Sequence, residues 1–503
     1  MNMKKIIRII ALFLALLTIS GMAVACSNPN EPEVTTEDNG VASTSAPAAE
    51  TTVEATDFVH DDLPESMNFG ETVTFFIWSD YTMREFHAEE NGNLIDESIY
   101  SRNNRVANRL GIEIAFVEEK GGGSKMNSWI QKAENDYQSD NAYDIYAGYS
   151  RAAPTMTING MTVNLLDYEN FNVEKPWWPR ALTDKCIIND KLYYCSGDIS
   201  TNLLWMMTAT YYNKELYEEY FLGEKTPMDL VQSNEWTMEK FFSMTKDIYT
   251  DDGNGQKDEF DFYGFTVYEQ NIDAYQFAAG ITSVEKNAEG TLVISEDWLS
   301  QRCADACTLV GEFLAEDGAF HSSKTDTARN VFFTKQAVFI MDRVFIIAGK
   351  DTSESGKIDF SYGIVPQPKY EADQEVFATN VAKNYTMYAV NSQSKKIEAA
   401  VTTLEAMGSE NYRNVTPAVF EVAMKVRYQD DPQASEMFDI LKENITFDIG
   451  NIYAESLGNT TANGFRTSAL SVNPSGYLSN ITKNKKIIEA GLAKIMEFYN
   501  SNT

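Results

Sequence analysis

The stretch "ETVTFFIWSD", residues 71–80, decides the fold class of this chain. It is a short apolar run, rich in β-branched and aromatic residues and ending in polar ones, which is typical of a buried β-strand. The next segment, "DESIYSRNNRVANRL" (96–110), has the apolar spacing of an amphipathic helix, and Gly111 supplies its stop. A second strand is predicted directly after this glycine, so the region forms a strand–helix–strand unit.

The same alternation continues to residue 150. "SWIQKAENDYQS" (128–139) predicts a helix and "AYDIYAGYS" (142–150) a third strand. Strands that alternate with helices form a mostly parallel sheet, so we predict an α/β fold. Ligands of open parallel sheets collect at the carboxyl ends of the strands. Four residues occupy such ends and become candidate ligand contacts: Trp78, Asp80, Tyr149 and Ser150.

The N-terminus indicates export. Residues 1–25 combine early Lys and Arg residues, an apolar stretch and small residues, which predicts a secretory signal peptide. Cys26 follows "AVA" and so resembles the acylated cysteine of bacterial lipoproteins; an ordinary signal with an incidental Cys26 is the alternative. Residues 26–67 are rich in Ser, Thr, Ala, Pro and Glu, which predicts a disordered tether. We therefore expect an extracytoplasmic protein anchored to the cell membrane by a lipid on Cys26.

Composition limits the partners. The 503-residue chain has 41 basic and 74 acidic residues, a formal net charge of −33, and shows no basic stripe. Such a chain repels nucleic acid, so we expect a neutral or cationic small-molecule ligand. A local cation such as Arg343 could override the long-range negative electrostatic field of the chain. Residues 68–503 suffice for two or three domains, and no later apolar run is long enough to span a bilayer.

Catalytic patterns are weak. The chain has three histidines, none in metal-ligand spacing, and no G-x-S-x-G motif. "SMTK" (243–246) and "SDN" (139–141) stand in the reverse order of the penicillin-binding pattern, and K-T-G is absent. We therefore predict a protein that is not an enzyme. A carboxylate pair of a carbohydrate-active enzyme stays as an alternative, because such a pair is defined in space and not by spacing.

Four cysteines follow Cys26. Cys186 and Cys195 bracket a hairpin with its turn at Asn189-Asp190, and the sequence leaves a disulfide between them open. Cys303 and Cys307 lie four apart in a helical segment, which predicts two buried thiols.

The stretch "TDDGNGQKDEFD" (250–261) is similar to a calcium loop. With Gly255 in the sixth position, the ligand positions of an EF-hand loop fall on Asp252, Asn254, Gln256, Asp258 and Asp261. Thr250 replaces the first Asp, and Asp261 replaces the bidentate Glu. We expect a structural loop, distant from the ligand, that either holds calcium or is a metal-free Asx turn. No other cofactor is expected.

An ordered series of motifs carries a resemblance over nearly all of residues 70–503. The motifs are "YDIYAGY", "PWW", "KLYYCSGDIS", "YYNKELYEEY", "EWTMEKF", "DDGNGQKDEFDFYGF", "KQAVFIMDR" and "YGIVPQPKYEADQE". In this order they resemble the extracellular solute-binding proteins (family 1, maltose-binding-protein-like) of bacterial sugar ABC importers. The resemblance implies a two-lobed periplasmic-binding-protein-like fold of class II.

The resemblance also implies where the chain passes between lobes. Crossings are expected near Tyr194–Asn202, Phe339–Arg343 and Phe377–Tyr385. Lobe 1 would comprise residues 68–200 and 340–380, and lobe 2 residues 201–339 and 381–503.

A neutral mono- or oligosaccharide between the lobes and the permease subunits of an ABC importer are the implied partners. A surface glycan-binding lipoprotein without a transporter is the main alternative. Stacking surfaces are expected at Trp78, Trp205 and Tyr268, although a tryptophan is more often core. The expected polar contacts and weaker candidates are Asp80, Tyr149, Asp198, Asn202, Asn271, Arg343, Asn384 and Tyr453, with Arg343 also able to pair with Asp342.

Overall fold

The computed structural model of the chain describes residues 59–80, 84–347, 358–420 and 432–501. These residues all belong to one compact unit, Asp57–Thr503. The predicted signal peptide, Cys26 and most of the predicted tether lie outside the described residues. Within the described ranges, no helix has the length and apolar character needed to cross a bilayer.

The first sheet contains the predicted strand at residues 71–80. Its strands stand in the order β13-β3-β1-β2, with β1 parallel to β2 and β3, and β13 antiparallel to β3. The predicted strand–helix alternation is therefore confirmed, as is the stop at Gly111, whose φ of 61° is left-handed. The elements are β1 (Thr72–Trp78), α2 (Leu94–Leu110), β2 (Glu113–Glu119), α3 (Met126–Tyr137), β3 (Ile145–Tyr149) and β13 (Thr386–Val390).

The second sheet has the order β11-β4-β10-β6-β5, and β9 pairs with β6 as an additional strand. The central strand β10 runs parallel to β6 and antiparallel to β4. We call the parts built around the first and second sheets lobe 1 and lobe 2. The strands are β4 (Thr208–Asn213), β5 (Tyr249–Thr250), β6 (Phe262–Tyr268), β9 (Ala319–Ser322), β10 (Ala337–Arg343) and β11 (Tyr362–Val365).

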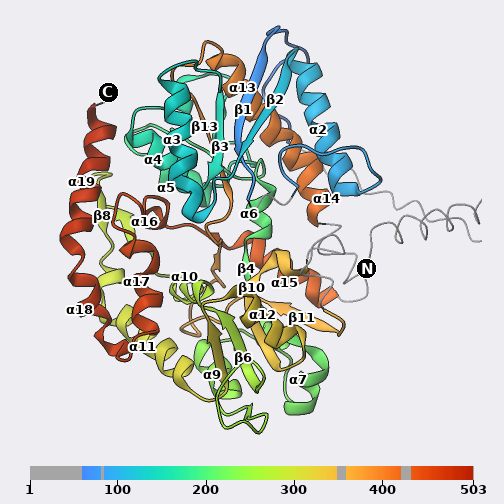
Figure 1. The fold of residues 1–503 in the computed structure, drawn as a ribbon, viewed down its shortest axis with the longest axis vertical. Helices are drawn as coiled ribbons and strands as arrows, with labels where there is room; N and C mark the ends of the chain where they lie inside the picture. Colours follow the sequence, from blue (N-terminus) through green and yellow to red (C-terminus); the bar gives the residue numbers. More distant parts are fainter. Residues whose placement is uncertain (1–58, 81–83, 348–357, 421–431, 502–503) are drawn as a thin grey trace, which may run out of the picture. The chain divides into compact units, whose positions relative to one another are not determined.

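The other elements pack on these sheets or on one another, and α16 to α19 lie along one side of the molecule in Figure 1. Helix α15 packs on β11 of lobe 2, and α17 and α18 pack on α11. The short strands are β7 (Val284–Lys286), β8 (Leu292–Ile294), β12 (Thr379–Asn380) and β14 (Ile445–Thr446). The helices are α4 (Ala152–Ile158), α5 (Arg180–Cys186), α6 (Thr201–Trp205), α7 (Lys214–Tyr220), α8 (Pro227–Gln232), α9 (Met238–Thr245), α10 (Ala274–Ala278), α11 (Gln301–Ala315), α12 (Thr325–Phe333), α13 (Ile397–Glu410), α14 (Thr416–Phe420), α15 (Pro432–Glu443), α16 (Ile449–Ile452), α17 (Thr460–Ala469), α18 (Tyr477–Thr482) and α19 (Lys485–Ser501).

Two segments carry the described chain between the sheets. The first runs from Cys195, which bridges Tyr388, to β4. The second runs from β11 back to β13, and its Val381 bridges Met207 of the first segment. These passages agree with the crossings expected near residues 194–202 and 377–385, and they lie side by side.

The third expected crossing, at 339–343, is wrong. These residues belong to β10, which is hydrogen-bonded on both edges in the middle of the second sheet. The expected lobe boundaries change with it, because β10 and β11 lie in lobe 2 whereas β13 lies in lobe 1. Residues 340–343 and 362–365 therefore belong to lobe 2, and residues 386–390 do not. The apolar part of β10, residues 337–341, would look the same in sequence whichever sheet buried it.

The four cysteines in the described part of the chain, Cys186, Cys195, Cys303 and Cys307, are free and buried. The turn expected at Asn189-Asp190 is present, with φ values of 49° and 58° that suit a type I′ turn. Cys186 nevertheless ends α5 and makes no disulfide with Cys195. The prediction of buried thiols at Cys303 and Cys307 is confirmed.

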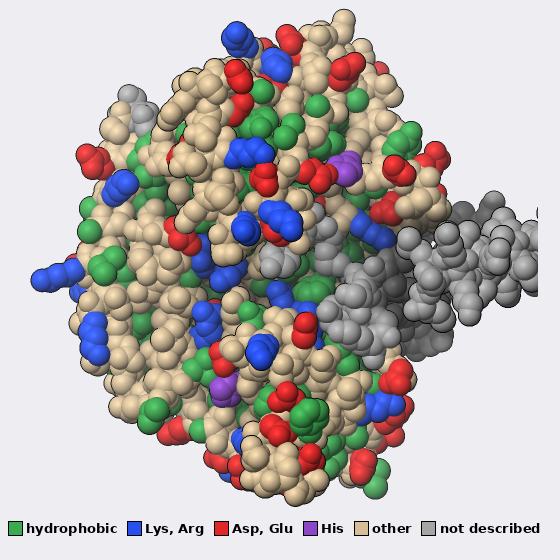
Figure 2. Space-filling model, viewed as in Figure 1, with side chains coloured by type: hydrophobic (Ala, Val, Ile, Leu, Met, Phe, Trp, Pro, Cys, Tyr) green, Lys and Arg blue, Asp and Glu red, His purple; other side chains and the backbone are tan. Residues whose placement is uncertain are grey.

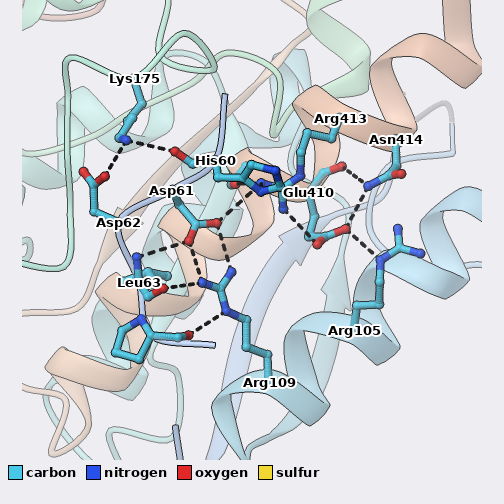
Figure 3. A network of polar contacts seen from close by, with 12 residues as sticks. His60, Asp61, Asp62, Leu63, Arg105, Arg109, Lys175, Glu410, Arg413 and Asn414 are labelled. Atoms are coloured by element: carbon cyan, nitrogen blue, oxygen red, sulfur yellow. Dashed lines mark hydrogen bonds and ion pairs between the residues drawn. The ribbon is translucent and has the colours of Figure 1, made fainter. Parts of the chain in front are cut away.

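Residues 59–67, which we expected in the disordered tether, are bound to lobe 1 (Figure 3). The Arg109 guanidinium, at the end of α2, donates to both carboxylate oxygens of Asp61 at 2.6 and 3.0 Å and to the carbonyl of Leu63 at 2.6 Å. Lys175 pairs with Asp62 at 2.6 Å. Burial alone would raise the pKa of Asp61, but hydrogen bonds from Arg109 and Ser409 outweigh it and lower the pKa. The tether therefore ends earlier than residue 67.

The Asp61–Arg109 contact makes a first prediction. Replacing Asp61 with Asn should lower the free energy of unfolding at pH 7 by roughly 1–3 kcal/mol, because the half-buried Arg109 guanidinium loses its charged partner. Asp61 has a lowered pKa, so its contribution is present above the ordinary value of 3.8 and is lost as pH falls through the folded value. Urea unfolding at several pH values measures this, and an unchanged difference between the variant and wild type at pH 3 would contradict it.

Candidate functional site

A cavity lies where the ends of strands from both sheets meet the second crossing segment. It holds about 430 Å³ of open space, which includes solvent at its mouth. Lobe 1 contributes Arg151, directly after β3, whereas lobe 2 contributes the ends of β6 and β10. The lining residues are Arg151, Tyr268, Gln270, Asn271, Asp273, Arg343, Asn380, Val381, Ala382, Lys383, Asn384, Asn451 and Ala462. A ligand here would touch both lobes.

Four of the predicted site residues line this cavity: Tyr268, Asn271, Arg343 and Asn384. Tyr268 ends β6 and Arg343 ends β10, and these strands are parallel neighbours, so their carboxyl ends lie together. Asn271 lies in the 3₁₀ turn η3 (Glu269–Asp273), which follows β6 directly.

Asp342 fixes the lobe 2 wall of the cavity. Its side chain is fully buried and lies 2.5 Å from Nε of Arg329 and 3.2 Å from Nε of Arg343. The Asn271 amide also donates to it at 3.2 Å. Burial alone would raise the pKa of Asp342, but the two guanidinium groups outweigh it and hold the pKa well below its ordinary value. Asp342 therefore stays ionised and holds Arg343 and Asn271 at the wall.

Arg151 forms the opposite wall. It is only 6% exposed, and its guanidinium donates to Oδ1 of Asn451 at 2.7 Å and to Oδ1 of Asn459 at 3.1 Å. Glu455 lies 3.5 Å away as an ion-pair partner. These contacts come from α16 and from the turn before α17, about 300 residues further along the chain. They hold the Arg151 guanidinium, which belongs to lobe 1, against α16 and the turn before α17.

Lys383 and Asp273 complete the charged lining. Burial, together with the nearby Arg151 guanidinium, lowers the pKa of Lys383 to about 8. Burial raises the pKa of Asp273 to about 6, although its ion pair with Arg466 opposes this. Both shifts show that water screens charges poorly here, so a charged or polar ligand group would interact strongly.

The sequence analysis missed Arg151, Asp273, Lys383 and Asn451. Two of them lie beside signals that it used, since Arg151 follows the strand predicted to end at residue 150 and Asp273 lies two residues after Asn271. Lys383 lies within the crossing expected at 377–385. The right segments were therefore identified, but not the side chains that face the cavity.

The structure buries the two predicted tryptophans. Trp78 is fully buried, donates to Oγ1 of Thr386 at 2.8 Å and packs edge-on against Tyr149. Trp205 is 2% exposed in α6. A sugar-stacking surface needs an open ring face, and neither indole offers one or lines the cavity. Tyr268 is the stacking candidate that does.

The other predicted residues make contacts within the protein. Asp80 accepts hydrogen bonds from the amides of Gly121 and Gly122. The Tyr453 hydroxyl lies 2.9 Å from that of Tyr499. The predicted site residues that do not line the cavity are Trp78, Asp80, Tyr149, Asp198, Asn202, Trp205, Tyr453 and Ser150, of which Ser150 lines an adjoining cavity.

Comparison with known proteins identifies the fold. No protein-family model matches the chain, and no curated protein sequence matches it. The galacto-N-biose/lacto-N-biose I-binding protein of a Bifidobacterium longum ABC transporter is similar in structure (TM-score 0.55, 12% identity, 86% of this chain and 99% of that one). So is the maltose/maltodextrin-binding domain MalE of Bdellovibrio bacteriovorus, bound to maltotriose (0.52, 11%, 84% and 100%).

A third similar structure is UgpB of Mycobacterium tuberculosis, in complex with glycerophosphocholine (TM-score 0.52, 13% identity, 84% of this chain and 99% of that one). At such identities the similarity establishes the fold, a two-lobed α/β architecture of the maltose-binding-protein type. The similarity by itself does not show which ligand this chain binds.

The loop at 250–261 is closed by its own hydrogen bonds. Asp261 is fully buried and accepts hydrogen bonds from the amides of Asp252 and Asp258 at 2.9 and 3.1 Å. The hydroxyls of Tyr249 and Tyr263 donate to it as well. Four donors saturate the carboxylate that would stand in the last ligand position. The carboxylates of Asp251, Asp252 and Asp261 do lie within 4.8 Å of one another.

The calcium assignment, with Asn254, Gln256 and Asp258 as further ligands, stays a prediction. Because the internal donors already satisfy Asp261, the geometry favours the metal-free Asx turn. Replacing Asp261 with Ala should lower the free energy of unfolding by roughly 1–3 kcal/mol, because the amides of Asp252 and Asp258 and the hydroxyl of Tyr249 lose their acceptor. Ligand affinity should stay within a few-fold, and the exposed Glu259→Ala in the same loop is the matched control. A melting temperature that rises with calcium in wild type but not in Asp261→Ala would instead establish the metal site.

Proposed function

We propose that this protein is an extracytoplasmic solute-binding protein that captures a saccharide between its lobes and delivers it to an ABC importer. The observation that carries the proposal is the cavity lined by Arg151 of lobe 1, by Tyr268 and Arg343 of lobe 2 and by the segment between the lobes. A ligand that contacts both lobes favours their closed arrangement by its differential affinity for that state. Closure is the signal that an importer can recognise.

A saccharide suits the lining. Amide and guanidinium groups are planar hydrogen-bonding partners for hydroxyls, and the cavity presents Asn271, Asn384 and Arg343. Tyr268 adds an aromatic ring for the apolar face of a sugar. Two of the similar structures bind lacto-N-biose and maltotriose, which supports the same ligand class here.

Catalysis is not proposed. A glycosidase needs two carboxyl groups that flank the scissile bond. Among the residues lining the cavity, Asp273 is the single carboxylate, and it is paired with Arg466. The three similar structures are likewise binding proteins.

A glycan-binding lipoprotein without a transporter differs from our proposal in lacking an importer. Co-purification of permease subunits with the membrane-bound protein would separate the two.

The cavity makes a prediction for binding. In calorimetry with the saccharide that gives the largest thermal shift in a glycan panel, Tyr268→Ala should weaken Kd by about five- to a hundred-fold, as loss of a buried aromatic anchor costs roughly 1–3 kcal/mol. Tyr100→Ala, an exposed tyrosine on α2 outside the cavity, is the control and should bind as wild type does. Equal affinity of both variants and wild type would place the site elsewhere.

We further propose that Cys26 carries the lipid that anchors the mature chain. The small residues before Cys26 and the polar segment after it support this. The Cys26→Ala variant should leave the membrane fraction and appear in the soluble extracytoplasmic fraction, because the remaining chain has no acyl group. Fractionation and immunoblotting measure this. A variant retained on membranes as tightly as wild type would refute the anchor.

A further inference from the structure

The charge of the cavity is opposite to that of the chain. The whole protein carries a formal net charge of −33, with acids outnumbering bases 74 to 41. The cavity lining instead contains three cations, Arg151, Arg343 and Lys383, and the single carboxylate of Asp273. In Figure 2, Lys and Arg side chains gather across the middle of the face shown. A positive cluster in so acidic a protein needs a physical reason.

The charges of the lining are not balanced within it. Arg343 shares the buried Asp342 carboxylate with Arg329, and Arg151 lies 3.5 Å from Glu455. Asp273, the one acid of the lining, is already paired with Arg466. Among the residues that line the cavity, three cations therefore stand against one carboxylate that is already paired.

Two donor groups at the cavity, Nε of Arg151 and the ammonium group of Lys383, have no hydrogen-bond partner among the described residues. Nε of Arg151 is buried and makes no hydrogen bond within the described part of the chain. For Lys383, the contacts described in residues 59–80, 84–347, 358–420 and 432–501 include no hydrogen bond or ion pair of its ammonium group. Asp448 lines an adjoining cavity together with Lys383, but its oxygens accept hydrogen bonds from Ser283 and Gly450. Burial lowers the pKa of Lys383 to about 8, so holding this charge in the free protein costs energy.

We propose that the saccharide is acidic, and that its anionic group binds in the cavity between Lys383, Arg151 and Arg343. This inference rests on the proposed function and replaces the expectation of a neutral ligand. Ammonium and guanidinium groups make strong, charge-assisted hydrogen bonds to the oxygens of carboxylate, sulfate or phosphate. Tyr268 and the amides of Asn271 and Asn384 are left for the sugar ring.

The net charge of the chain does not oppose this binding at contact distance. Salt screens charges beyond about 8 Å at physiological ionic strength, so distant acids act weakly on a bound anion. The three cations would lie against the ligand in a poorly hydrated cavity, where pairing is least screened. The acidic surface slows the approach of an anion more than it weakens the final complex.

The test compares matched ligands by calorimetry on the full chain. The acidic arm contains digalacturonate, galactose 6-sulfate and glucose 6-phosphate, so that carboxylate, sulfate and phosphate are distinguished. The neutral arm contains digalacturonate dimethyl ester, galactose and glucose. We expect at least one acidic ligand to bind about tenfold or more tightly than its neutral counterpart. Neutral members that bind as tightly as the acidic ones, or an acidic arm that does not bind, would overturn the inference.

Two variants change the cavity charge in opposite directions. Lys383→Met should weaken binding of the acidic ligand by about tenfold or more, and Lys383→Arg should restore most of it. Lys486→Met removes the same charge from the exposed face of α19. It should change Kd less than about twofold, because salt screens the interaction between this surface charge and the bound ligand.

Asp273→Asn should strengthen binding, because it removes the one anion of the lining. A damaged fold cannot produce that gain, so a loss of affinity in Asp273→Asn would contradict the inference.

The outcomes also separate this inference from the proposed function. Tight binding of neutral saccharides that is insensitive to Lys383→Met would leave the saccharide receptor intact and remove only the acidic ligand. Binding of glycerophosphocholine with no binding of either sugar arm would overturn both.

Discussion

A buried carboxylate at the end of a central strand determines the geometry of this site. Asp342 has no exposed side-chain surface, and a charge in that position is tolerated only when it is paired and hydrogen-bonded. Arg329, Arg343 and Asn271 supply those partners. Two of them are also walls of the cavity, so the requirement to satisfy one buried acid places a guanidinium and an amide where a ligand would bind. Replacing Asp342 would leave two buried cations beside each other and disturb the site before any ligand arrives.

The same arrangement explains why total charge misleads about the ligand. Most of the acids that make the chain strongly negative lie outside the cavity, where water and salt screen them. The cavity presents Arg151, Arg343 and Lys383 in surroundings that shift the pKa of Lys383 to about 8. A count over all residues weights each charge equally, whereas binding weights each charge by its distance and burial.

Sequence periodicity was sufficient for the local architecture. The alternation from β1 to β3 and the stop at Gly111 follow from patterns of a few residues, whereas the two crossings that agree with the structure were implied by the family resemblance. What failed depends on contacts between distant segments. Arg151 becomes a site residue because Asn451 and Asn459 hold it, about 300 residues away. Trp78 is core because Thr386 and Tyr149 enclose it. The lobe of β10 is fixed by its neighbours β4 and β6, since its apolar residues 337–341 do not indicate which sheet buries them.

The central claim is that a ligand bridges the two lobes at the ends of β3, β6 and β10. Hydrogen–deuterium exchange of the full chain, with and without a saturating saccharide ligand, tests it most directly. The account predicts slower exchange in peptides from both sides of the cavity, over residues 150–155 of lobe 1 and 268–273 of lobe 2, together with 380–384 between them. Protection confined to one lobe, or absent from all three segments while ligand is bound, would contradict it.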